Sequence, residues 1–130
     1  DRYNQEWQNI VFQALIATTL AVILTALINI LIDYDFGFLG QILFICLIAL
    51  VIMELLNAFY FKSKRRRLLQ AYAGVIIFTL YLLYDFNRLE KAIASGDTSW
   101  STAIEIAVNL YLDIINLFLD LLEILATSSD

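Results

Sequence analysis

Four long apolar segments follow one another along the chain, separated by short polar stretches. No charged residue occurs between Glu6 and Asp33, and Glu54 is the one charge between Asp35 and Lys62. A helix that crosses a bilayer needs about 20 apolar residues. The segments are too long for strands and do not alternate, so we predict helices. The predicted helices span about residues 7–32, 36–61, 68–94 and 100–126.

The polar stretches between the segments have the composition of turns. Residues 33–37 form a short acidic turn, and residues 95–99 are small and polar. Gly96 suits the residue that follows a helix C-terminus. The third helix is therefore expected to end near residue 94. Thr102 and Glu105 fit a capping box if the last helix starts late.

A run of five cations lies in residues 62–67. We interpret this run as a solvated loop; a site for anionic lipid is the alternative. By the positive-inside rule the loop would be cytoplasmic.

Composition places the chain in a membrane. Of the 130 residues, 62% are hydrophobic and 16% are charged, whereas a soluble domain has about 45–50% apolar and about 25% charged residues. The predicted fold is an all-α polytopic membrane helical bundle, with residues 1–130 as a single transmembrane domain. The absence of histidine and the single cysteine exclude imidazole catalysis and a zinc ribbon. Paired carboxylates could serve an intramembrane hydrolase, but the Gly-Leu-Gly-Asp-like motif of such an enzyme is missing, so no enzyme and no cofactor are expected. The net charge of −5 argues against nucleic acid.

The fourth segment carries the chemistry. Its polar residues are spaced by 3 or 4 positions, which places them on one face of a helix. Acidic side chains are costly against acyl chains, so this face must contact protein or a water-filled path. A surface-bound amphipathic helix and a solvated bundle helix are the alternatives. The polar positions are Thr102, Glu105, Asn109, Asp113, Asn116, Asp120 and Glu123.

An antiparallel hairpin about the 95–99 turn would bring specific charges together. Asp85 and Asp113 then differ in depth by about four residues, or about 6 Å, which a small stagger removes. Arg88 lies level with Glu105, and it is also three residues from Asp85. We therefore predict a pair of aspartates with Arg88 beside it.

Two carboxyl groups in a poorly solvated site do not both ionise readily, so they share a proton and titrate as a coupled unit. The same oxygens suit a hard cation such as calcium. Asp85 and Asp113 are the predicted proton-sensing pair and a transient calcium site. The predicted supporting or pore-lining residues are Arg88, Glu105, Asn109, Asn116, Asp120 and Glu54.

Three motifs resemble those of the Bax inhibitor-1 family, also called the transmembrane Bax inhibitor motif or Lifeguard family. The segment Asn109–Leu119 (NLYLDIINLFL) resembles the signature of that family's last helix. Leu83–Asp85 (LYD) is similar to its other acidic motif, and Asp35–Gly40 (DFGFLG) to a stretch between two earlier helices. The resemblance runs from about residue 12 to residue 125.

The resemblance implies a seven-helix bundle with a central last helix, of which this chain matches the last four helices. It also implies a pH-sensitive calcium leak, and a role in modulating cell death and calcium stores. Asp85 and Asp113 match the acidic pair that gates the leak. Phe86 departs from the family pattern, which usually has threonine there. The family pattern would also reverse the orientation that the basic run indicates, so the orientation stays open.

The sequence thus favours a calcium leak channel gated by the two aspartates. The alternative is a non-conducting membrane adaptor that binds other membrane proteins through its polar helix face. The expected partners are the lipid bilayer, calcium and protons. The expected location is an integral membrane position, in the endoplasmic reticulum or Golgi of a eukaryote or virus, or in a bacterial inner membrane.

Overall fold

Helices account for nearly all of the residues that the computed structural model describes, which are 2–97 and 99–128. The apolar segments fold into helices as predicted, with a five-residue π-helix continuing the second one. The elements are α1 (Arg2–Leu31), α2 (Leu39–Leu56), the π-helix η1 (Asn57–Phe61), α3 (Lys64–Ala94) and α4 (Trp100–Ser128).

Three of these helices are long and apolar enough to cross a membrane: α1, α2 with its π-helical continuation, and α3. Most of their large apolar side chains are exposed, as a lipid-facing surface requires. Helix α4 has 29 residues and is equally long, but it carries four carboxylates. The chain is an all-α membrane helical bundle, as predicted.

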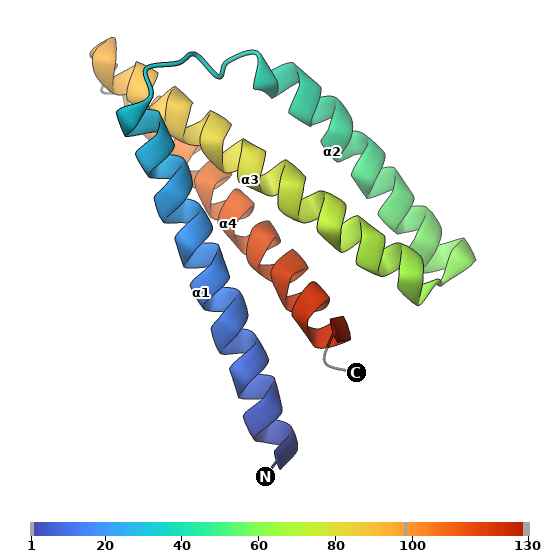
Figure 1. Ribbon diagram of the computed structural model, residues 1–130. Coiled ribbons are helices and arrows are strands. Elements are labelled where there is room, and N and C mark those ends of the chain that lie inside the picture. Colours follow the sequence, from blue (N-terminus) through green and yellow to red (C-terminus); the bar gives the residue numbers. More distant parts are fainter. Residues whose placement is uncertain (1, 98, 129–130) are drawn as a thin grey trace.

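Helix α3 occupies the middle of the bundle and packs against each of the other three long helices (Figure 1). Its most extensive contact is with α4, which also packs against α1, whereas α2 makes its main contact with α3 alone. A small apolar core joins α2, α3 and α4 through Leu50, Phe78, Leu82 and Leu117. Figure 1 shows α2 on the opposite side of α3 from α1, with α4 behind.

The predicted basic loop is shorter than expected, because α3 begins at Lys64 and not near residue 68. Ser63 caps the helix by accepting a hydrogen bond from the Arg66 backbone N–H at 3.3 Å. Lys62 turns the chain in the left-handed region, at φ 48°. The buried Asn57 side chain holds this turn with two hydrogen bonds to the Ser63 backbone, at 3.0 and 3.1 Å. Four of the five cations therefore lie on the first turn of a helix.

The turn between α3 and α4 follows the prediction at both ends, and only the capping box differs. Helix α3 ends at Ala94, and Gly96 has φ 76°, as the residue after a helix C-terminus often does. The predicted capping box is wrong: Ser99 accepts the Thr102 backbone N–H at 3.3 Å, and α4 begins at Trp100. Of the predicted turn, residue 98 lies outside the described residues.

Polar contacts fasten the α1–α2 loop to α3. Asn87, buried on α3, donates to Asn29 Oδ1 at 3.2 Å and to the Tyr34 carbonyl at 3.1 Å. Lys91 forms an ion pair with Asp35. The hydrogen bond from Lys91, and then that from the Gly37 backbone, lowers the pKa of Asp35 below its usual value.

Candidate functional site: an acidic cavity between α2, α3 and α4

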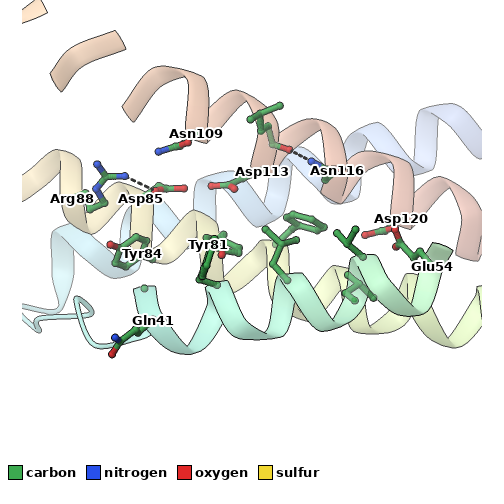
Figure 2. A pocket seen from close by; sticks show the side chains of 17 residues that line it. Gln41, Glu54, Tyr81, Tyr84, Asp85, Arg88, Asn109, Asp113, Asn116 and Asp120 are labelled. Carbon is green, nitrogen blue, oxygen red and sulfur yellow. Dashed lines mark hydrogen bonds and ion pairs between the residues drawn. The ribbon is translucent and has the colours of Figure 1, made fainter. Parts of the chain in front are cut away.

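Asp85 on α3 and Asp113 on α4 are both buried, with 2% and 5% of their surfaces exposed. Figure 2 shows their carboxyl groups pointing toward each other across the space between the two helices. The predicted stagger of the α3–α4 hairpin therefore brings the pair level. Such a juxtaposition is unusual in an apolar bundle, because two like charges at close range repel.

One oxygen of this pair lacks a hydrogen-bond partner. Asp113 Oδ2 is fully buried, and no described residue donates a hydrogen bond to it. An ionised carboxylate is only an acceptor, whereas a protonated one is also a donor. A buried acceptor left unsatisfied costs about 1–3 kcal/mol. A proton held between Asp85 and Asp113, or a cation bound there, removes both this cost and the repulsion.

Arg88 lies at one end of the pair. Its Nη1 is 3.5 Å from Asp85 Oδ1, and its Nη2 is 3.0 Å from Glu105 Oε1, so both ion pairs predicted for it are present. The guanidinium also lies 5.9 Å from the centre of the Tyr84 ring. Arg88 therefore neutralises one carboxylate of the pair and is held in place from two further sides.

A cavity of about 700 Å³ contains the aspartate pair. Its walls come from α2, α3 and α4. Seven of the eight sequence-predicted site residues line it: Glu54, Asp85, Arg88, Asn109, Asp113, Asn116 and Asp120. The polar face of α4 thus turns into the bundle, as the sequence predicts.

Glu105 is the exception among the predicted residues. Its side chain is 62% exposed and lies outside the cavity lining, where it reaches the cavity only through Arg88. It is nearer the start of α4 than the residues of that helix that line the cavity. Its contact is an ion pair at the rim.

A second cavity, of about 620 Å³, lies beyond Glu54 and Asp120, which line both cavities. Figure 2 shows these two side chains at the far end from Arg88. Arg67 and Glu123 form an ion pair of 2.6 Å at the second cavity. A series of polar groups thus extends along much of the length of α4.

Several residues of the cavity wall are not predicted from the sequence. Tyr81 and Tyr84 on α3 and Gln41 on α2 belong to the cavity wall. Gly40 is needed there, because a Cβ at that position would lie 2.7 Å from the Tyr84 hydroxyl oxygen. The DFGFLG motif carries this glycine, but nothing in its spacing identifies Tyr84 as the neighbour.

The cavity offers oxygen ligands without forming a closed metal site. Among the described residues, no group of three or more His, Cys, Asp or Glu side chains is positioned to hold a metal ion. The two aspartates and the Asn109 amide supply hard oxygens of the kind that calcium takes.

Comparison with known proteins gives a consistent result. A family model described as "Inhibitor of apoptosis-promoting Bax1" matches residues 3–130. The chain is 41% identical to Protein LIFEGUARD 4 of Arabidopsis thaliana over 70% of its length, which covers 35% of that protein. It is 32% identical to the Golgi anti-apoptotic protein of Vaccinia virus, over 93% of the chain and 48% of the viral protein.

A bacterial relative shows the same extent of similarity. The chain is 34% identical to a protein of Helicobacter pylori strain J99 over 92% of its length. That match covers 49% of the bacterial protein. The chain therefore spans about half the length, or less, of these relatives.

Proposed function

The chain belongs to the Bax inhibitor-1 family, and we propose that it contributes the gate of a pH-sensitive calcium leak. The observation that carries the proposal is that two buried carboxyl groups face each other in one cavity, and that Asp113 Oδ2 has no hydrogen-bond partner among the described residues. We further propose that the leak serves a cell-death-modulating role in an internal membrane. The description of the family model and the name of the viral relative support this role.

The proposed gate works through the charge of the pair. When a proton is shared, the Asp85 and Asp113 carboxyl groups hydrogen-bond to each other and hold α3 against α4. When the proton leaves, two negative charges repel, and Arg88 neutralises only one of them. The remaining charge attracts a cation into the cavity. Calcium conduction is therefore expected to rise as the pH rises through the transition.

Glu54 and Asp120 extend the proposed path of the calcium ion beyond the aspartate pair, because both side chains line the two cavities. A calcium ion leaving the aspartate pair would next meet these two carboxylates, and then Glu123, which is paired with Arg67. We propose that lipid or further protein completes the wall of this path.

Calcium flux into dye-loaded liposomes, measured across pH 5.5–8, tests the proposal. Asp113→Asn imitates the protonated pair, so its flux is expected to be low and nearly independent of pH. Asp33→Asn is the matched control: it removes one carboxylate from an exposed position in the α1–α2 loop. The control is expected to keep the pH profile of the wild-type chain.

Two results would reject the gate. One is an unchanged pH profile in the Asp85→Asn/Asp113→Asn double variant. The other is a loss of calcium flux in the Asp33→Asn control as large as that in Asp113→Asn. A wild-type chain that carries no calcium at any pH would favour the adaptor function. In that case, partner proteins should co-purify with the chain and be lost when Asn109 or Asn116 becomes leucine.

A further inference from the structure

A third cavity, of about 510 Å³, lies between α2 and α3; neither aspartate of the pair lines it, although Leu50 lines both this cavity and the first. Its walls are largely apolar and come from α2, η1 and the first half of α3. Met53 and Leu69 on opposite walls are 55% and 59% exposed. The apolar lining residues are Leu50, Met53, Leu56, Phe61, Leu69 and Ala73. Exposed apolar walls on membrane-spanning helices face acyl chains.

One end of this groove is basic. Arg65 and Arg66 line it where α3 begins. The Arg66 guanidinium lies 4.1 Å from the centre of the Phe61 ring, which fixes its position at the groove. No carboxylate is among the described residues that line the groove. The groove thus combines a cationic end with an uncharged, apolar body.

The remaining cations of the run face elsewhere. Lys62, Lys64 and Arg67 line the second cavity, which also contains Glu54, Asp120 and Glu123. Helical periodicity produces this division: positions three apart share a face, and the two positions between them turn away. One group of cations therefore faces the acids of the bundle interior, and the other faces the bilayer.

The position of Arg65 and Arg66 favours an anion for a second reason. They lie in the first turn of α3, at the positive end of the helix dipole. This turn lies at the end of two apolar helices, where lipid headgroups are expected. Phosphate on a lipid would meet both the guanidinium groups and the helix end.

We propose that this groove binds one anionic phospholipid, with its phosphate at Arg65 and Arg66 and an acyl chain between Met53 and Leu69. Charge complementarity selects the anionic headgroup, and the apolar walls select a lipid over free phosphate. This site replaces the interpretation of the whole basic run as a solvated loop. The proposal does not rest on the calcium leak, because neither aspartate of the pair lines the groove.

The test compares two charge-matched double variants. The chain is reconstituted with equal amounts of phosphatidylglycerol and phosphatidylcholine that have the same acyl chains, and retained lipid is counted by native mass spectrometry. Arg65→Gln/Arg66→Gln removes two charges from the groove, whereas Lys62→Gln/Lys64→Gln removes two from the other cavity. We expect one phosphatidylglycerol on the wild-type chain, roughly tenfold less on the arginine variant, and near wild-type retention on the lysine variant.

A third variant tests the apolar part of the groove without changing charge. Leu69→Trp fills the space between the walls at an exposed position, so folding is preserved, and it should also reduce phosphatidylglycerol retention. The proposal is overturned if the two double variants lose the lipid equally, since that result indicates diffuse attraction. It is also overturned if Leu69→Trp leaves retention unchanged, or if the wild-type chain does not prefer phosphatidylglycerol.

Discussion

At the scale of single residues, Asp35 shows how a loop outside the membrane depends on pH. Its carboxylate pairs with Lys91 and accepts the Gly37 backbone N–H at 2.8 Å. Because these bonds lower the pKa of Asp35 below 3.8, the ionised form holds the loop above that pH, and the contact is lost as the pH falls through the lowered value. Asp35→Asn should therefore raise hydrogen exchange in residues 32–38 at pH 7, by about two- to fivefold.

Asp33 provides the control for that measurement, since it is exposed in the same loop. Asp33→Asn should leave the exchange rates of the loop unchanged after correction for intrinsic exchange. Acid should loosen the loop in the wild-type chain and have little further effect in Asp35→Asn. Equal protection in both variants would show that the ion pair does not hold the loop.

Residue patterns predict much of the site but not its close contacts. The spacing on the fourth segment identifies the polar face, and simple hairpin counting pairs Asp85 with Asp113. The contact between Tyr84 and Gly40 depends on a side-chain position across two helices, and no local pattern encodes it. Asn87 is missed for the same reason, because its partners lie in a loop distant in sequence.

At the scale of helices, Gly74 leaves room for the Asp120 side chain between α3 and α4. A Cβ at this position would overlap the Asp120 carboxylate. Gly74→Val should therefore displace Asp120 and lower the free energy of unfolding by about 1–3 kcal/mol, the usual cost of overpacking. Denaturant-induced unfolding in detergent micelles measures this change.

A double-mutant cycle assigns the cause of the Gly74→Val effect. In an Asp120→Ala background the added side chain has room, so the valine should cost much less. An undiminished cost in that background would mean that helix propensity, and not the close contact with α4, requires the glycine.

Long apolar runs predict the existence of every helix because spanning segments have few alternatives in lipid. Helix ends are harder to predict. The charges of the basic residues after Ser63 predict a loop, but Ser63 caps the helix, so that α3 begins at Lys64. The π-helix at Asn57–Phe61 has no sequence signal comparable to an apolar run. It closes with a hydrogen bond from the Lys62 backbone N–H to the Asn57 carbonyl, and the Asn57 side chain bonds to Ser63 beyond it.

At the scale of the whole molecule, the cavity should admit water while the outer helix faces should not. Cysteine substitution with a charged thiol reagent tests this in liposomes, in a Cys46→Ser background because Cys46 is exposed. Asn109→Cys and Asn116→Cys line the cavity and should react. Val108→Cys and Tyr111→Cys lie on an exposed apolar face of the same helix and should be protected by lipid.

The reverse labelling pattern, with the cysteine at position 111 reacting and that at position 109 protected, would place the polar face of α4 toward lipid. Uniform reactivity along α4 would indicate that this helix does not cross the membrane. Either result would remove the water-filled route on which the proposed leak depends.

The proton shared by the two buried aspartates is the central claim, and infrared spectroscopy with isotope-labelled aspartate tests it most directly. In lipid vesicles at pH 7, where exposed aspartates are ionised, the wild-type chain should retain a protonated carboxyl band. Asp120 also lines the cavity, so the variants are made in an Asp120→Asn background. In this background Asp113→Asn should abolish the band, and Asp33→Asn should preserve it. A wild-type spectrum with ionised carboxylates alone, or a band that survives Asp113→Asn, would contradict the account.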